Sequence, residues 1–403
     1  MRPLEGIKVI EMTHMLSGPT AGLLLADLGA DVVKLEKTDG GEDTRRMVPP
    51  SMAGESASFM VINRGKRGLA LNIKSADGLA ILKQMLSQAD ILLENYRLGT
   101  LEKLGLSYEE LYNINPRLIY CQITGFGITG PYAERPGLDL ITQGMSGLMS
   151  VTGEGPGRAP IKAGGPLSDI SAGHIAVSGI LAAYIQRLKT GKGQHVDTSL
   201  LEAAIVHTYW ISSTAFATGH TPVATGSAHA IATPYQALAT KDGYVNVGCA
   251  TQGLWERLLK VLGDEHLATD KRFQDNPSRH IHRQELILRL GEIFSLRKTT
   301  HWVDALSKGG VPCGPVLSIT DMHRDPQVLE RKMVIKVQHS ILGEMDAIGC
   351  PVKLSGSDSP SSYGAPILGE HSIEVLTSYG IQKNEIAKLV ESGVVLQGDA
   401  TAK

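Results

Sequence analysis

Asp169 is the residue with the clearest capacity for chemistry, because it follows a turn-forming segment at residues 164–166 (GGP) and opens a predicted helix. The partial positive charge and the unbonded N–H groups of a helix N-terminus stabilise an ionised carboxylate. Such a carboxylate could act as a nucleophile at neutral pH, and the small residues around it would let a bulky thioester approach. Aspartate is also among the commonest helix caps, so a purely structural role for Asp169 stays open at this point.

Two other segments carry groups that suit ligand binding. The basic run at residues 63–67 (NRGKR) fits either phosphate binding or a solvated turn. Residues 94–97 (ENYR) end a predicted parallel strand, and ligands of open α/β sheets gather at the carboxyl ends of the strands. We therefore expect residues 94–97 to lie at a binding site.

Several common catalytic and cofactor motifs are absent from the chain. There is no G-x-G-x-x-G after the first predicted strand, no G-x-x-x-x-G-K-[ST] loop and no G-x-S-x-G turn. The thirteen histidines include no H-E-x-x-H, and the four cysteines include no C-x-x-C pair. We expect no metal site, no permanently bound cofactor and a reducing compartment.

Strand and helix patterns alternate along the first half of the chain. Strands are predicted at residues 7–12, 30–36, 68–73, 90–94, 118–123 and 194–197, and helices at residues 21–28, 76–89, 107–114 and 169–188. This alternation predicts an α/β fold with a mostly parallel sheet and right-handed crossovers.

The 403 residues are enough for two domains. We predict a large domain from residues 1–200, a linker at residues 201–224, a small domain at residues 225–331, and a return through a second linker to the large domain over residues 332–403.

Charge and hydropathy restrict the partners of the chain. A formal net charge of -2 argues against nucleic acid. We find no run of the roughly 18 apolar residues that a membrane helix needs, and the early strand at residues 7–12 leaves no room for a signal peptide. We therefore expect a cytoplasmic protein that binds neither nucleic acid nor membrane.

Five segments together resemble the class III coenzyme A transferases, the family of formyl-CoA transferase and carnitine CoA-transferase. They are GADVVKLE, NRGKRGLALNIK, LLENYRLGTLEKLGL, ITGFGITGPYAERPGLD and TGEGPGRAPIKAGGPLSDISAG. The resemblance runs from about residue 4 to residue 370. It implies a Rossmann-like large domain formed by both chain ends, a smaller α+β domain formed by the middle, and a homodimer in which two such chains interlock as rings.

The resemblance places the family's nucleophilic aspartate on Asp169. It implies contacts with coenzyme A at His14, Met15, Lys37, Leu71, Asn72, Ile73, Lys74, Asn95, Tyr96, Arg97 and Lys103. The candidate substrate-site residues are Leu16, Asp139, Gln252 and Gly253. Leu16 replaces a glutamine of formyl-CoA transferase, and the glycine-rich covering loop of that enzyme is reduced here to residues 250–253 (ATQG). Both departures argue against oxalate or formate as a substrate.

The resemblance implies that CoA moves from an acyl-CoA such as succinyl-CoA to a carboxylic or dicarboxylic acid, through anhydride and thioester intermediates on Asp169. An alternative is an α-methylacyl-CoA racemase, which shares the fold but uses a Gly-His-Asp motif. Here Leu138 takes the place of that histidine, and leucine is neither an acid nor a base. A non-catalytic CoA-binding protein is a third interpretation. No residue identifies the two acids.

Overall fold

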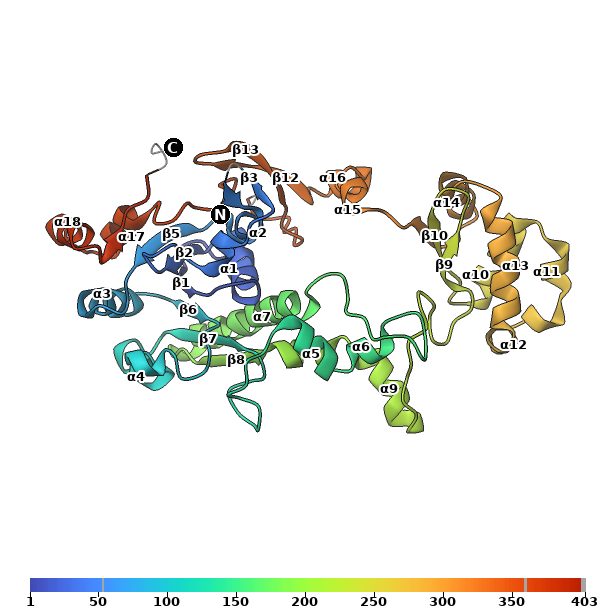
Figure 1. Ribbon diagram of the computed structural model, residues 1–403, viewed down its shortest axis with the longest axis horizontal. Helices are drawn as coiled ribbons and strands as arrows, with labels where there is room; N and C mark the ends of the chain where they lie inside the picture. Colours follow the sequence, from blue (N-terminus) through green and yellow to red (C-terminus); the bar gives the residue numbers. More distant parts are fainter. Residues whose placement is uncertain (53, 359–360, 400–403) are drawn as a thin grey trace. The chain divides into compact units, whose positions relative to one another are not determined.

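The computed structural model describes residues 1–52, 54–358 and 361–399, and the chain divides into two compact units (Figure 1). Unit 1 comprises Met1–Leu148, Lys162–Gly219 and Gln327–Lys403. Unit 2 comprises Met149–Ile161 and His220–Pro326. Both ends of the chain therefore build unit 1, while the middle and one short earlier segment build unit 2.

A seven-stranded sheet forms the centre of unit 1. Its order is β14 (Val395–Leu396), β5 (Arg67–Leu71), β2 (Asp31–Glu36), β1 (Lys8–Met12), β6 (Ile91–Glu94), β7 (Ile119–Thr124) and β8 (His195–Ser199). All neighbouring strands are parallel except β14, which pairs antiparallel with β5. The predicted α/β fold with a mostly parallel sheet is confirmed, and the antiparallel edge strand is an addition to it.

The order of the strands creates a switch point between β1 and β6. After β1 the chain adds β2 and β5 on one side, and it then adds β6, β7 and β8 on the other. In open α/β sheets the crevice outside the carboxyl ends of the strands at such a point is where ligands bind. The topology alone therefore directs attention to the residues that follow β1 and β6.

Helices cover both faces of this sheet. One face packs on α3 (Ala76–Leu86), α4 (Tyr108–Ile114), α17 (Ser372–Ser378) and α18 (Lys383–Glu391), and the other on α1 (Ser17–Asp27), α7 (Leu167–Thr190) and α8 (Leu200–Val206). Neighbouring residues of β1 show the division, because Val9 belongs to the second face and Ile10 to the first. Burial on both faces explains why these strands are nearly continuous apolar runs.

The other elements of unit 1 are short. They are η1 (Asp43–Arg46), β3 (Ser51–Met52), β4 (Glu55–Ser56), α2 (Ala57–Asn63), η2 (Glu102–Leu104), α5 (Asp139–Met145), α9 (Tyr209–Thr218), β12 (Val334–His339) and β13 (Gly343–Ile348). The chain passes between the units after Leu148 in α6 (Leu148–Val151), after Ile161, after Gly219, and after Pro326 at the start of α16 (Pro326–Glu330). The predicted linker at residues 201–224 thus contains most of α8 and all of α9, and the second predicted linker contains the β12–β13 hairpin.

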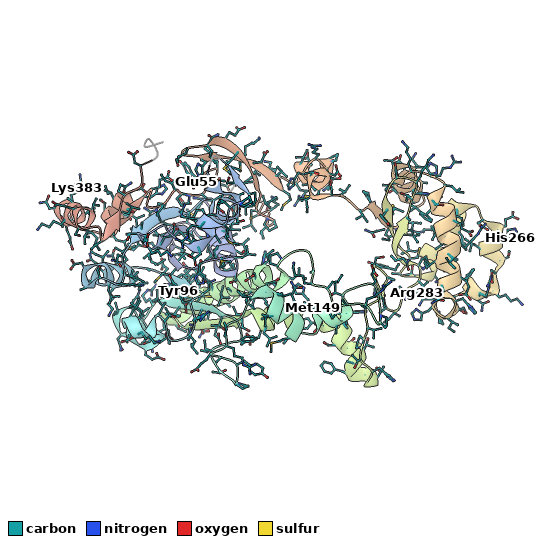
Figure 2. All side chains as sticks on the ribbon, in the orientation of Figure 1. Glu55, Tyr96, Met149, His266, Arg283 and Lys383 are labelled. Atoms are coloured by element: carbon teal, nitrogen blue, oxygen red, sulfur yellow. The ribbon has the colours of Figure 1, made fainter. Side chains whose placement is uncertain are left out.

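Unit 2 has its own sheet and core. Its antiparallel strands are β9 (Tyr235–Ala239), β10 (Tyr244–Gly248) and β11 (Cys313–Pro315). Its helices are α10 (Gln252–Leu262), α11 (Glu265–Thr269), η3 (Lys271–Phe273), α12 (Asn276–Ile281), α13 (Arg283–Ser295), α14 (Thr299–Lys308) and α15 (Ile319–Met322). Figure 2 shows His266 and Arg283 on this unit. Phe294 and Trp302 stack in the core with ring centroids 4.4 Å apart.

Helix α7 carries Asp169 and packs closely against α1. A Cβ atom added at Gly173 would lie 2.7 Å from the Ser17 carbonyl oxygen and 2.8 Å from Thr20 Cβ, so glycine permits this approach. Within the described residues α7 is also the one helix long and apolar enough to cross a membrane by length and composition. Its residues Ala172 and Ile180 are fully buried in unit 1, and we therefore interpret α7 as a core helix.

We expect Gly173→Ala to lower the free energy of unfolding by about 1–3 kcal/mol, because the added methyl group must push α1 away from α7. Gly291→Ala on α13 is the matched control, since no heavy atom lies within 4 Å of its added Cβ. There alanine should stabilise the helix by up to about 1 kcal/mol. Urea unfolding followed by circular dichroism measures both. Equal stability of the two variants would contradict the close approach.

Candidate active site

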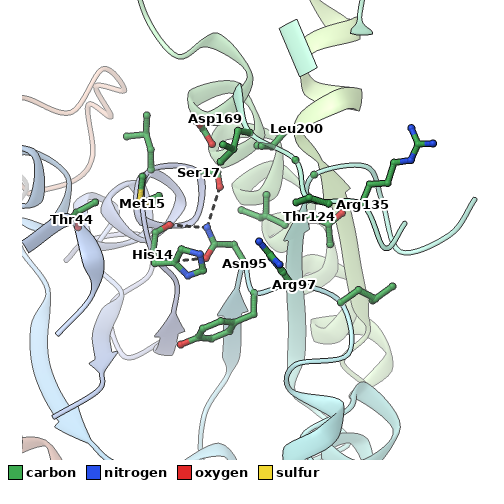
Figure 3. Close-up of a pocket in the computed structure, with 18 of the residues that line it drawn as sticks. His14, Met15, Ser17, Thr44, Asn95, Arg97, Thr124, Arg135, Asp169 and Leu200 are labelled. Carbon is green, nitrogen blue, oxygen red and sulfur yellow. Dashed lines mark hydrogen bonds between the residues drawn. The ribbon is translucent and has the colours of Figure 1, made fainter. Parts of the chain in front are cut away.

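A cavity of about 560 Å³ lies at the carboxyl ends of β1, β6 and β7 in unit 1 (Figure 3). Its wall includes residues 14–17 after β1, residues 95–98 after β6, residues 123–125 at the end of β7 and residues 133–138 further along. Asp169 from α7 and Leu200 from α8 complete this side. The cavity therefore occupies the switch point of the sheet.

The structure brings part of the predicted site into this cavity. The predicted residues in its wall are His14, Met15, Leu16, Asn95, Tyr96, Arg97 and Asp169. The exposed Lys37, Lys74 and Lys103 lie outside the wall, after β2, after β5 and in η2. Residues 71–73 also lie outside it, and the Leu71 side chain is buried in the core, so only its backbone could meet a ligand.

Three of the candidate substrate-site residues lie elsewhere. Asp139 begins α5 and hydrogen-bonds to the first turn of α7 rather than lining the cavity. Gln252 and Gly253 begin α10 in unit 2. The Gln252 amide is engaged at both ends, since it donates to the Gln274 carbonyl (2.8 Å) and accepts from Arg279 Nη1 (3.0 Å). Its role as a substrate contact stays a prediction.

The cavity also has a wall that no sequence motif marks. It is formed by Thr44, Met47, Ser58, Val61 and Ile62, which come from η1, α2 and the chain between them. These residues have the composition of an ordinary amphipathic surface, and only the path of the chain between β2 and β5 turns them toward the cavity. Arg135 is a further missed residue, and its guanidinium lies over the Tyr132 ring at 4.0 Å.

The Asn95 side chain ties together the two loops at the switch point. Its Oδ1 accepts a hydrogen bond from the His14 N–H (2.9 Å), and its Nδ2 donates to the His14 carbonyl (2.9 Å) and to Ser17 Oγ (3.2 Å), as Figure 3 shows. Both ends of the amide therefore hold the loop after β1 against the loop after β6. Asn95 shapes the cavity, and contact with a ligand would add to this structural role.

Two buried lysines hold the loop after β1 from the protein interior. Lys34 and Lys66 have fully buried side chains and both pair with Glu11, at 3.2 Å and 2.8 Å. Lys34 Nζ also donates to the Thr13 carbonyl (2.6 Å), and Lys66 Nζ donates to the Pro19 carbonyl (3.0 Å). These bonds fix the backbone on both sides of Met15, which adopts a left-handed φ of 64°. The strained turn at the cavity is thus supported by a buried ion network.

Burial shifts the pKa values of two polar groups beside the cavity, His14 and Glu94. Burial lowers the pKa of the half-buried His14, with the Lys34 charge adding to the effect, so the imidazole is neutral at pH 7. Burial raises the pKa of Glu94 to about 8, so this carboxyl is mainly protonated at pH 7. Glu94 Oε2 accepts a hydrogen bond from the Tyr96 N–H at 2.7 Å. Glu94 thereby fixes the backbone of the segment that was predicted to bind a ligand.

Asp169 is the third residue of α7 and not its cap. No hydrogen bond to its carboxylate is found among the described residues. Burial, assisted by the Asp139 charge, raises the pKa of Asp169 to about 7. The helix N-terminus was expected to favour the ionised form of Asp169, and burial together with the Asp139 charge opposes this effect. A carboxylate that titrates near neutrality is a stronger nucleophile than an ordinary one.

The N–H groups at the start of α7 are mostly occupied. The N–H groups of Leu167 and Ile170 donate to backbone carbonyls, and that of Ser168 donates to Asp139. Among the first-turn N–H groups that the structure describes, the N–H of Asp169 itself is therefore the one left to stabilise an oxyanion. The start of α1 lies at the same cavity through Leu16 and Ser17 and offers further candidate donors.

Among the side chains that the structure describes, no group of three or more His, Cys, Asp or Glu residues could hold a metal ion. The cavity combines a desolvated carboxylate with a neutral imidazole, a phenol and a guanidinium. This set is suited to acyl exchange on a carboxylate.

Comparison with known proteins decides the class. The sequence of residues 4–372 matches the protein family described as CoA-transferase family III. The chain belongs to this family. The protein is therefore an enzyme, a class III CoA-transferase, as its sequence motifs predicted. The interpretation as a non-catalytic CoA-binding protein is not supported.

The sequences of several relatives align with this CoA-transferase along nearly the whole chain. A succinate–glutarate CoA-transferase from Agrobacterium fabrum is 39% identical and covers 93% of this chain and 95% of its own. An acetyl-CoA:oxalate CoA-transferase from Acetobacter aceti is 39% identical and covers 91% and 93%. The crystal structure of a CaiB/BaiF family protein from Brucella suis has a TM-score of 0.85 at 39% identity and covers 94% and 99%.

We expect Asp169→Asn to raise the Tm of the CoA-transferase more at pH 8 than at pH 5. Because the pKa of Asp169 is raised to about 7, the folded chain holds a proton that the unfolded chain releases above pH ~4. The resulting loss of stability grows with pH and is complete only above about 7, and asparagine does not suffer it. Differential scanning fluorimetry measures the effect, with the exposed Asp304→Asn as control. An equal gain at both pH values would contradict the desolvation of Asp169.

Proposed function

We propose that this enzyme transfers coenzyme A from succinyl-CoA or a similar acyl-CoA to a dicarboxylic acid, with Asp169 as the nucleophile. The observation that carries the proposal is the Asp169 carboxylate, which lines the cavity at the switch point and accepts no hydrogen bond from the described residues. The named activities of the relatives, on succinate with glutarate and on acetyl-CoA with oxalate, support a dicarboxylate as one of the two acids. The oxalate relative also weakens the argument from Leu16 against oxalate.

The reaction needs no group beyond the two substrates and Asp169. The carboxylate attacks the donor thioester, the C–S bond breaks, and CoA departs as its thiolate. The product on the enzyme is a mixed anhydride between Asp169 and the donor acyl group. The thiolate then attacks the aspartyl carbonyl, releases the donor acid as its carboxylate and forms an aspartyl-CoA thioester. The acceptor carboxylate repeats the two steps in reverse order, giving the new acyl-CoA and free Asp169. Each step exchanges one anionic nucleophile for one anionic leaving group, so no net proton transfer is required.

The residues around the cavity fit the binding of the CoA portion. His14, Tyr96 and Arg97 offer an imidazole, a phenol and a guanidinium beside the nucleophile. We propose that Lys37, Lys74 and Lys103 meet the phosphates of coenzyme A, since they are exposed cations on segments that follow β2, β5 and β6. Residues 71–73, with Leu71 through its backbone, belong to the same proposed binding surface.

We further propose that two chains form the interlocked homodimer that the resemblance implies. Helix α9 has no buried residue, and its Tyr209, Trp210 and Phe216 side chains are 69%, 70% and 89% exposed in the single chain. An apolar helix of this kind is typical of a surface that a partner covers. Light scattering should give twice the chain mass of 43.1 kDa. A monomer at micromolar concentration would contradict the dimer.

We expect Asp169→Ala to abolish transfer from succinyl-CoA to glutarate while the fold and CoA binding persist. Wild-type enzyme incubated with succinyl-CoA and then treated with hydroxylamine should yield a modified Asp169 in peptide mass spectrometry, because hydroxylamine attacks activated acyl groups. The variant should yield none. Asp304→Asn serves as the control for handling and assay. Turnover by Asp169→Ala would rule out the mechanism.

The second acid is expected to be a short dicarboxylate. With succinyl-CoA as donor, turnover should be higher with glutarate, mesaconate, citramalate or oxalate than with the monocarboxylates formate and butyrate. Liquid chromatography of the new thioester measures the rates. A clear preference for a monocarboxylate would contradict this part of the proposal and leave the role of Asp169 intact.

A further inference from the structure

We propose that Asp139 and Gln143 of α5 form a clamp that positions Asp169 by capping α7 from outside the helix. The inference rests on the proposed function, in which Asp169 is the nucleophile. It assigns to Asp139 a positioning role in place of the predicted contact with substrate.

The first part of the clamp is an N-cap supplied by another helix. α7 begins after Pro166, which offers no side-chain cap. Asp139 Oδ1 accepts a hydrogen bond from the Ser168 N–H at 2.9 Å, which is the bond that a capping residue normally accepts. Ser168 is completely buried and directly precedes Asp169. The position of the first turn of α7 therefore depends on α5.

The second part of the clamp is Gln143, one turn along α5 and 1% exposed. Its Nε2 donates to Asp139 Oδ2 at 2.8 Å, and its Oε1 accepts from the Ala163 N–H at 3.0 Å. The same Nε2 lies 3.5 Å from the Gly165 carbonyl, a weaker contact. Gln143 thus fixes the Asp139 carboxylate and also holds the start of the loop that leads to the nucleophile.

Gly164 and Gly165 of this loop are exposed. A Cβ atom added at Gly164 or Gly165 would meet no heavy atom within 4 Å, so these two residues are not fixed by close packing in unit 1. Hydrogen bonds from α5 therefore determine where the loop enters α7. A reacting group misplaced by about 1 Å can lose about a hundredfold in rate, so the clamp bears on turnover.

The geometry argues against direct contact between Asp139 and substrate. Both carboxylate oxygens of Asp139 are engaged, and the residue is not part of the cavity wall. A proton carrier of the racemase type would need a free oxygen that faces the substrate. Asp139 therefore acts through Asp169.

Asp139 is also the charge that bears most directly on Asp169. Other ionisable groups share the cavity or lie on elements packed against α7. They are His14, Tyr96, Arg97, Glu134, Arg135, Glu202 on α8, His195 and Asp197 on β8, Tyr120 and Cys121 on β7, and Asp27 on α1. None of these adds to the upward shift of the Asp169 pKa, which comes from burial and from Asp139. Removing the Asp139 charge should therefore move the acid limb of the pH profile to lower pH.

The test exchanges the carboxylate and the amide. In D139N the Asn amide keeps an acceptor for Ser168 but presents an NH₂ group to the NH₂ group of Gln143, so the clamp is broken. In the double variant D139N/Q143E the glutamate accepts from the new amide and from the Ala163 N–H, so the main bonds are restored. We expect kcat to fall tenfold to a hundredfold in D139N, with KM for succinyl-CoA changed less than about twofold. The double variant should recover most of this loss.

The pH profile separates positioning from a general structural effect. The acid limb of kcat should lie at lower pH in D139N than in the wild type, because the carboxylate of Asp169 loses a like charge. Q143M, which breaks the loop contacts without altering charge, should lower kcat with the acid limb unmoved. This second variant also serves if D139N fails to fold by circular dichroism.

Three outcomes would overturn the clamp: unchanged kcat in both D139N and Q143M, a loss that Q143E does not restore, or a loss that varies with the acceptor acid. The hydroxylamine experiment keeps these outcomes apart from failure of the proposed function. A normal adduct on Asp169 together with an active D139N enzyme contradicts the clamp alone. Absence of the adduct in wild-type enzyme contradicts the nucleophile itself.

Discussion

A carboxylate that acts as a nucleophile must be partly stripped of its hydrogen-bond donors, and in the proposed mechanism the site of this CoA-transferase is arranged around that constraint. A carboxylate at a helix N-terminus would normally accept N–H groups and lose basicity as a result. Here Asp169 is displaced into the first turn, and Asp139 accepts the N–H of Ser168 in its place. Burial then raises the pKa of Asp169 to about 7. In the proposed mechanism, the reactivity of Asp169 therefore depends on a second carboxylate that occupies the helix end.

The loop after β1, which lines the cavity, depends on buried charges that pair with one another. The Glu11, Glu42, Lys34 and Lys66 side chains are buried, with Lys34 paired to both carboxylates and Lys66 to Glu11. The two ammonium groups also bond to carbonyls on either side of the loop after β1. Breaking such a network leaves an unpaired buried charge, which typically destabilises a protein by about 3–5 kcal/mol. The network therefore fixes a loop that contains a left-handed, non-glycine residue at Met15. Rigidity at the switch point is obtained from electrostatics as well as from packing.

Local sequence patterns predicted the regular part of the fold well. The strand expected at residues 7–12 is β1, and the helix expected at residues 169–188 is α7, because buried apolar runs and their glycine-rich ends carry a strong local signal. Residues 201–224 were predicted to be a linker, and they contain most of α8 and all of α9. The edge strand β14 and the helix α5 were not predicted, since both are short and depend on distant partners.

The sequence by itself determined the class of the protein, because five ordered segments and an aspartate at a helix start are local features that folding does not alter. Only the tertiary structure decided the direction in which the pKa of Asp169 is shifted and which residues share its cavity. Thr44 and Val61 enter the wall through the path of the chain between β2 and β5, and Asp139 meets α7 across 29 positions of sequence. Burial and through-space charge depend on such distant neighbours, and for that reason a carboxylate predicted to be a simple anion titrates near neutrality in the folded enzyme.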